Sequence, residues 1–286
     1  MHKTPYIKSL LSYKHNHELN PGLSLAEIES FEQKNNTTLP EPLKELYLHF
    51  DGGELFIPGT TVYSLYSPDS GYSLIEENTP DVRQYICIPD TYLIFASYCW
   101  GDRVCINTSA PYDVVEWDHE TNEISYSWDG LDSFLLYEIE RFEDYIAEDL
   151  KSVVSKLKEQ GKSVFIDGAT KKQIEAFEAK NNISLPAELK KWLCFSDGGD
   201  LFLPAGIQLH GVTHKPLIDV NDNDKPSNDY IVIGTLASGD PILCQKERTQ
   251  ISIYNREAGR IEITEIYSDF FSLLDDFLDS LKSADD

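Results

Sequence analysis

Residues 35–56 read NNTTLPEPLKELYLHFDGGELF, and residues 181–202, which lie 146 positions later, read NNISLPAELKKWLCFSDGGDLF. An alignment of residues 24–58 with residues 170–204 needs no gap, and 17 of its 35 positions are identical. Identity of this extent at one constant offset indicates an internal repeat. The chain therefore contains two copies of one structural unit, here named copy one and copy two.

Each copy is expected to open on a helix. Ser24 with Glu27, and Thr170 with Gln173, fit the capping-box pattern, in which a hydroxyl and a carboxylate or amide satisfy the first free amides of a helix. The asparagine pairs that begin the quoted stretches predict the ends of these helices, because asparagine tolerates the left-handed conformation of a helix C-cap.

A second helix is expected after the Leu-Pro dipeptide of each copy. Apolar residues keep helical spacing over residues 43–50 and 189–193. The Asp-Gly-Gly triplets that follow, at 51–53 and 197–199, predict the ends of these helices, because glycine commonly stops a helix.

Strand-like segments occupy the rest of each copy. They lie at residues 54–57, 92–96, 103–107, 114–117 and 123–126 in copy one, and at 200–203, 230–234, 241–245, 251–255 and 260–264 in copy two. Each copy then closes on an amphipathic helix, expected at 131–150 and 269–281. The predicted fold class is α+β, with two tandem domains in which helices cover one side of an antiparallel meander.

The predicted domains are residues 1–150, which are strongly acidic, and residues 169–286. Residues 1–20 are expected to be a mobile N-terminal segment. Residues 151–168 are basic and favour a helix, and they predict a linker between the domains.

Composition limits the classes of protein that fit. The N-terminus has no uninterrupted apolar stretch of signal-peptide length, and no later segment reaches the roughly 18 apolar residues of a membrane span. The five cysteines include no CxxC pair and no zinc-like spacing with histidine. We therefore expect a cytoplasmic protein without metal, cofactor or membrane association.

The charge of the chain is unevenly shared between its halves. The net charge is −25; residues 1–150 hold 27 acidic and 8 basic side chains (−19), and residues 151–286 hold 22 and 16 (−6). This balance argues against nucleic-acid binding, because a phosphate backbone attracts basic surfaces. Two interpretations of the imbalance stay open: a partner-facing surface on copy one, or neutral drift of surface charge.

No catalytic site is evident from the sequence. His49, His119, His210 and His214 have no histidine at the matching position of the other copy, whereas a duplicated active site is expected to keep one. Copy one has about eight extra residues between positions 65 and 92. This acidic loop is a candidate for function, because loops carry functional residues more often than the elements that they connect.

Candidate partner-binding residues lie in this loop and in the meander of copy one. Trp117 between Glu116 and Asp118 combines an aromatic side chain with an acidic rim, as protein interfaces often do. The simpler interpretation is that Trp117, like Trp100 and Trp128, is a core or half-buried strand residue. The predicted set comprises Glu76, Glu77, Asp113, Glu116, Trp117 and Asp118.

The order of motifs resembles one known family. Each copy has I-x-x-F-E, then L-P, then D-G-G-x-L-F, then a strand meander with a Gly-Asp pair and a closing helix, as in the SUKH superfamily of the Smi/Knr cell-wall-regulator type. The resemblance implies non-enzymatic binding modules without catalytic residues. It also implies that the recurring positions are fold determinants: Leu39, Pro40, Gly52, Gly53, Gly101, Asp102, Leu185, Pro186, Gly198, Gly199, Gly239 and Asp240.

Two functions follow from this resemblance. Many bacterial members are immunity proteins that neutralise polymorphic toxins, often nucleases, and an acidic inhibitor suits the basic phosphate-binding surface of such a toxin. Other members are intracellular regulators of cell-wall synthesis or signalling that bind an endogenous protein. We expect the first function, exerted by copy one on a basic toxin domain, and keep the second as the alternative.

Overall fold

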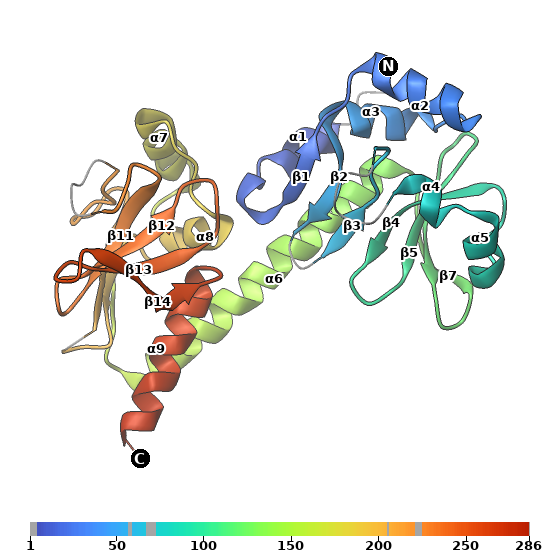
Figure 1. Ribbon diagram of the computed structural model, residues 1–286. Helices are drawn as coiled ribbons and strands as arrows, with labels where there is room; N and C mark the ends of the chain where they lie inside the picture. The colour runs from blue at the N-terminus through green and yellow to red at the C-terminus, as the bar shows by residue number, and fades with distance from the viewer. Residues whose placement is uncertain (1–4, 57–58, 67–72, 205, 221–224, 286) are drawn as a thin grey trace. The chain divides into compact units, whose positions relative to one another are not determined.

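The computed structural model describes residues 5–56, 59–66, 73–204, 206–220 and 225–285 (Figure 1). The chain forms two compact units, Met1–Phe142 and Glu143–Asp286, which contain copy one and copy two. Each unit holds a seven-stranded antiparallel sheet whose strands are hydrogen-bonded in sequence order, β1 to β7 and β8 to β14. The predicted α+β class with two antiparallel meanders is confirmed.

The predicted helices and strands of copy one occur in the predicted order. Its helices are α1 (Pro5–Leu11), η1 (Lys14–Asn16), α2 (Leu25–Asn35), α3 (Glu41–His49), α4 (Leu74–Glu77), α5 (Pro80–Ile86) and α6 (Leu131–Gln160), which continues into copy two. Its strands are β1 (Glu18–Pro21), β2 (Phe50–Leu55), β3 (Thr60–Val62), β4 (Tyr92–Tyr98), β5 (Arg103–Asn107), β6 (Val114–Asp118) and β7 (Glu123–Trp128). Of these, α1, η1, β1, β3, α4 and α5 are additional to the predicted elements.

Copy two repeats this order without counterparts of α4 and α5 among its described residues. Its helices are α7 (Lys171–Asn181), α8 (Ala187–Phe195) and α9 (Phe270–Asp285). Its strands are β8 (Val164–Phe165), β9 (Gly199–Leu201), β10 (Ile207–Leu209), β11 (Tyr230–Leu236), β12 (Pro241–Gln245), β13 (Ile251–Asn255) and β14 (Arg260–Tyr267). None of the helices in the described part of the chain is both long and apolar enough to cross a membrane.

Both predicted capping boxes are present. The Ser24 hydroxyl accepts a hydrogen bond from the Glu27 amide, and the Glu27 carboxylate accepts one from the Ser24 amide at 2.7 Å. Thr170 and Gln173 make the same pair at the start of α7. Both helices end at an asparagine in the left-handed conformation, as the sequence predicts. The Leu-Pro dipeptides then place a buried leucine and the N-cap proline of the next helix.

The prediction that the Gly-Gly pairs stop the second helices is wrong. Helix α3 ends at His49, one residue before β2 begins, and both glycines lie inside β2. Gly53 has a φ of +119° and pairs with Leu19 of β1, and a Cβ on Gly53 would lie 2.2 Å from the Glu18 carbonyl oxygen. Gly199 pairs in the same way with Phe165 of β8 and has a φ of +127°. The glycines are therefore needed for close strand pairing.

The aspartate before each Gly-Gly pair is a fold determinant that the sequence reasoning missed. Asp51 is buried, and its carboxylate accepts hydrogen bonds from the Ser64 hydroxyl and the Leu65 amide, both at 2.7 Å. Asp197 is fully buried and accepts from the Val212 amide at 2.6 Å, as well as from the amides of the next two residues. Each carboxylate thus fixes the segment that follows β3 or β10.

The repeat extends further toward the N-terminus than the sequence comparison indicates. The pairing of Leu19 in β1 with Gly53 recurs 146 residues later as the pairing of Phe165 in β8 with Gly199. Ile7 and Leu10 of α1 are buried, and so are Val153 and Leu157 in the C-terminal part of α6.

These contacts correct two expectations. The segment expected to be mobile is folded from Pro5 onward and contributes to the core. Most of the predicted 151–168 linker is likewise part of copy two: it forms the end of α6, which reaches Gln160, and strand β8. The unit boundary follows Phe142 and not residue 150. The sequence comparison did not reveal this extension of the repeat, because α1, β1 and their counterparts in copy two make equivalent contacts with few identical residues.

A glycine just before each capping box lies against the end of the second helix. A Cβ on Gly22 would lie 2.4 Å from the Leu48 carbonyl oxygen, and one on Gly168 would lie 2.0 Å from the Cys194 carbonyl oxygen. Position 48 corresponds to position 194 at the offset of 146. In both copies the next residue donates its amide to that helix, Leu23 to Tyr47 and Ala169 to Leu193, at 2.8 Å.

The extra residues of copy one form α4 and α5, which pack on the sheet (Figure 1). Asn78 donates a hydrogen bond to the Ile94 carbonyl oxygen and accepts one from the Ile94 amide, so α4 is attached to β4. Ile86 is buried, and its carbonyl oxygen accepts from the indole of Trp117 in β6. Residues 67–72 of this predicted functional loop lie outside the described residues.

The buried His17 leads to a testable pH dependence. Its Nε2 lies 2.9 Å from the Leu10 carbonyl oxygen, and its Nδ1 accepts the Phe56 amide at 3.1 Å, so the neutral ring satisfies both contacts. Burial lowers the pKa of His17 below 6.5, although the bond to Leu10 partly offsets this effect. In acid the unfolded chain binds a proton that the folded chain does not, so the His17 contribution to stability falls as the pH drops below about 6.5.

We expect the difference in unfolding free energy between the wild type and His17→Gln to shrink from pH 7 to pH 5. Urea denaturation in a Trp192→Phe background measures this difference, because all remaining tryptophan fluorescence then comes from copy one. Carboxylate titrations are common to both proteins and cancel in the comparison. A difference that stays constant over this range contradicts the prediction.

Candidate partner-binding surface

The predicted partner-binding residues lie on two opposite faces of the copy-one sheet. Trp117 in β6 is the cross-strand partner of Arg103 in β5, so the two side chains share a face of the sheet. The Arg103 guanidinium lies 3.3 Å from the Glu77 carboxylate, on the face covered by α4 and α5. Glu116, the neighbour of Trp117 in β6, is opposite Tyr126, whose ring lies 5.7 Å from that of Tyr137 in α6. The six residues therefore do not form one surface.

Several of these carboxylates have partners within the chain. Besides the Glu77 pair with Arg103, the Asp113 carboxylate accepts from the Tyr92 hydroxyl at 2.7 Å and from the Asn107 amide at 3.0 Å. Glu76 is exposed and accepts from the hydroxyl of the helix-capping Ser73 at 2.9 Å. These contacts hold the strands and α4 in place.

Trp117 is not an exposed anchor, so that part of the interface hypothesis is wrong. Its side chain is 6% exposed, and its indole N–H donates to the Ile86 carbonyl oxygen at 2.8 Å. The alternative interpretation of Trp117 as a core residue is confirmed. Helix α5, which belongs to the extra residues of copy one, supplies the burial.

Two carboxylates and one imidazole gather on the α6 side, at the end of the sheet where the β4–β5 and β6–β7 turns meet. Asp102, Asp118 and His119 each place a donor atom within 4.8 Å of the others. Asp102 Oδ1 accepts the His119 amide at 3.0 Å and lies 2.7 Å from the His119 Nδ1. Asp118 accepts the Glu120 and Thr121 amides at 2.7 and 2.9 Å. Because these carboxylate oxygens already accept hydrogen bonds from amides of the turn residues, the group is a weak candidate for a metal site.

The electrostatics of this group differ from residue to residue. Burial raises the pKa of Glu116, and the charge of Asp102 raises it further. Burial also acts to raise the pKa of Asp102, but hydrogen bonds from His119 and Trp100 outweigh it and hold that pKa below its ordinary value. Hydrogen bonds from the Thr121 and Glu120 amides lower the pKa of Asp118.

The Asp102 contact predicts how His119 titrates. The hydrogen bond that the His119 ring donates to Asp102 raises the pKa of His119 above 6.5, so its imidazolium persists to a higher pH than in a free peptide. We expect Asp102→Asn, which removes the negative charge, to return the His119 midpoint toward about 6.5. NMR titration of the imidazole carbon protons measures both midpoints. An unchanged midpoint in the variant would show that Asp102 does not control this histidine.

Trp100 is one of the exposed aromatic residues beside these carboxylates. It is 50% exposed, its indole N–H donates to Asp102 Oδ2 at 2.9 Å, and its ring stacks on that of Tyr98 at 4.4 Å and 12°. Tyr98 is itself buried and donates its hydroxyl to Glu138 Oε1 at 3.1 Å. Trp100 is thus fixed on two sides while half of its surface faces solvent.

A buried polar network holds Tyr98, on which the Trp100 ring stacks. The Glu138 side chain is fully buried and accepts from the Thr60 hydroxyl at 2.6 Å and from the Arg141 guanidinium at 2.8 Å. Burial raises the pKa of Glu138, and the charge of Arg141 opposes this shift. The Arg141 guanidinium lies 4.9 Å from the Tyr98 ring centre and 5.4 Å from that of Trp100, so it also attracts these rings electrostatically.

The sequence reasoning missed Trp100 as an anchor, although a comparison of the copies holds the signal. In copy two Ser238 takes its place, and the Ser238 hydroxyl donates to Asp240 at 2.8 Å just as the indole donates to Asp102. The Arg256 amide donates to Asp240 at 3.0 Å, as that of His119 does to Asp102. A large aromatic side chain at a position where a serine also fits is typical of a surface and not of a core.

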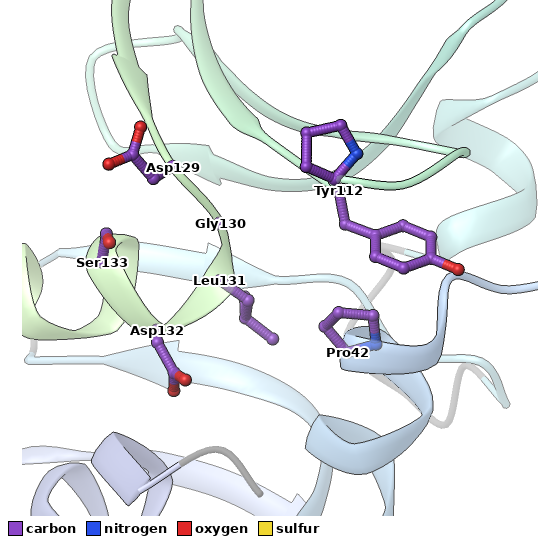
Figure 2. A pocket seen from close by; sticks show the side chains of 8 residues that line it. Pro42, Tyr112, Asp129, Gly130, Leu131, Asp132 and Ser133 are labelled. Atoms are coloured by element: carbon purple, nitrogen blue, oxygen red, sulfur yellow. The ribbon is translucent and has the colours of Figure 1, made fainter. Parts of the chain in front are cut away.

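A pocket of about 150 Å³ lies elsewhere in copy one, where α6 begins. It is lined by Pro42, Pro111, Tyr112, Asp129, Gly130, Leu131, Asp132 and Ser133. Figure 2 shows Leu131 pointing toward Pro42. This volume is below the roughly 300–1,000 Å³ of typical small-molecule sites, so the pocket is a weaker candidate than the Trp100 surface.

Comparison with known proteins gives the family. The sequence model of the SMI1 / KNR4 family (SUKH-1) matches residues 22–137 and again residues 168–276. These ranges begin at Gly22 and Gly168, the two glycines that lie against the ends of α3 and α8. A search of curated proteins found no match. The two matches cover most of both copies, and the chain therefore belongs to the SMI1 / KNR4 family (SUKH-1), of which it carries two tandem domains.

Proposed function

We propose that this protein is a non-enzymatic binding module that acts as an immunity protein and occludes a basic toxin domain with copy one. The observation that supports it is the Trp100 surface: a fixed, half-exposed tryptophan beside Asp102, Glu116 and Asp118, in the more acidic half of the chain. Tryptophan is among the residues that contribute most to protein interfaces, and carboxylates attract a basic partner and speed its approach. A nuclease toxin is such a partner, because it binds phosphate.

The test begins with affinity capture of the tagged protein from its native cells. A second capture uses a variant with Glu116, Glu120 and Glu123 changed to lysine, since all three lie on or near the β6–β7 hairpin and the last two are exposed. A control variant carries the same charge change at the exposed residues Glu29, Asp81 and Glu257. Each captured protein is then expressed alone and together with this chain.

The proposal expects a basic protein that the hairpin variant loses and the control variant retains. That protein should stop growth when it is expressed alone, and co-expression of this chain should restore growth. Capture of a harmless cell-envelope or signalling protein would instead favour the regulatory alternative. Equal capture by all three proteins would show that the hairpin is not the binding surface.

A further inference from the structure

Trp100 differs from every other tryptophan in the chain. The side chains of Trp117, Trp128 and Trp192 are 6, 7 and 1% exposed, whereas Trp100 is 50% exposed. A half-exposed indole ordinarily samples several rotamers, and binding must restrict them. Trp100 is already restricted by the Asp102 hydrogen bond and the Tyr98 stack, so a partner that contacts it loses little further freedom.

The free surface of Trp100 is suited to a cation. Tyr98 covers one face of the indole by nearly parallel stacking, which leaves the other face as the principal contact surface. The face of an indole attracts ammonium and guanidinium groups within about 6 Å. Arg141, which is held by its ion pair with Glu138, already lies within this range of the same aromatic pair.

The charged side chains around Trp100 indicate which sign of charge a partner group should carry. Asp102, Glu116 and Asp118 lie on this side of the sheet, while the guanidinium of Arg141 is paired with Glu138. Carboxylates in excess over cations favour a positively charged occupant and disfavour an acidic or purely apolar one. Burial is the largest cause of the raised pKa of Glu116, and the neighbouring Asp102 carboxylate adds to it by opposing ionisation.

Copy two does not repeat this chemistry. Ser238 replaces the tryptophan, and buried Ile253, which is opposite Ile242 of β12, replaces Glu116, which is opposite Val104 of β5. The fold-determining Gly-Asp pair is kept in both copies. The aromatic and acidic side chains of copy one are therefore not required by the fold that the two copies share.

We propose that Trp100, with Glu116 beside it, is the subsite that receives one arginine or lysine side chain of the protein partner. The cation stacks on the free indole face, and the Glu116 carboxylate supplies the ion pair. This inference rests on the proposed function only in assuming that copy one binds a basic protein, and it specifies the contact that the partner makes.

The test uses the full chain and a tetra-arginine peptide, followed by the four indole N–H signals in ¹⁵N NMR at low salt, with Trp100→Phe to assign its signal. We expect the Trp100 signal to shift in a saturable way while those of Trp117, Trp128 and Trp192 stay in place. Glu116→Gln should weaken binding several-fold, and the exposed control Glu257→Gln should leave it unchanged. A tetra-glutamine peptide should cause no shift.

Two results would overturn this inference. One is a Trp100 signal that does not move, or moves no more than those of the buried tryptophans. The other is a Trp100 shift that Glu257→Gln weakens as much as Glu116→Gln, because binding would then reflect only the total negative charge. Neither outcome depends on whether a captured partner is toxic, so this test and that of the immunity function can fail separately.

Discussion

Replacement of Asp51 by alanine is expected to destabilise copy one strongly and to leave the stability of copy two unchanged, and replacement of Asp197 is expected to do the reverse. Each carboxylate is buried and accepts hydrogen bonds from backbone amides of the segment that follows β3 or β10. Alanine would leave these donors buried without an acceptor, and each such loss costs about 1 to 3 kcal/mol. With two or more donors affected, we expect a loss of about 4 kcal/mol, a large fraction of the stability of one domain.

Hydrogen exchange followed by mass spectrometry separates the two copies in the same sample. In Asp51→Ala the peptides from β2, β3 and β4 should lose much of their protection, while those from β9, β10 and β11 should keep theirs. The matched control is the asparagine variant, which keeps one acceptor oxygen and should lose less. Full protection of copy one in Asp51→Ala would show that water replaces the carboxylate and that the aspartate is not a fold determinant.

Gly22→Ala and Gly168→Ala are expected to be nearly as damaging. The added methyl group would lie 2.4 or 2.0 Å from a backbone carbonyl oxygen at the end of the second helix. A backbone atom cannot move aside as a flexible side chain does, so the chain must pull away and weaken the amide hydrogen bonds of Leu23 or Ala169. Overpacking of this kind costs about 3 kcal/mol.

The matched control for these variants is Gly161→Ala. Gly161 has a φ of +65° but no atom near its Cβ position, so alanine there adds only backbone strain, about 1 kcal/mol. Thermal unfolding of all three variants should show a much larger drop in Tm for Gly22→Ala and Gly168→Ala. Equal drops would mean that the close approach to the helix end has no energetic consequence.

Local rules predicted much of the fold. The capping boxes, the asparagine C-caps and the strands β5, β12 and β13 agree with the sequence, because each depends on a few neighbouring residues. The Asp-Gly-Gly triplets were misassigned because glycine after an apolar helix has two explanations, a helix cap or close strand pairing. Only the position of β1, which lies more than 30 residues earlier in the chain, distinguishes them.

The candidate surface shares Glu116 and Asp118 with the residues predicted from the sequence, but its aromatic residue is a different tryptophan. An aromatic anchor with an acidic rim was assigned to Trp117, because that residue lies between two acidic neighbours in the sequence. In a strand these neighbours point away from the tryptophan, so sequence adjacency places them on the opposite face. The anchor that shares a face with Glu116 is Trp100, which comes from a different turn, and only the pairing of β4 through β7 brings them together.

The extent of α6 bears on how the duplication arose. One uninterrupted helix contributes Phe134 and Phe142 to the first unit, and Val153 and Leu157 to the second. A fragment that begins at residue 168, where the second family match begins, would therefore lack β8 and part of its own core, whereas one that begins at Glu143 would keep both. At the level of the gene, the junction between the two copies therefore falls within the codons of a single helix, so that the end of one module is also the first segment of the next.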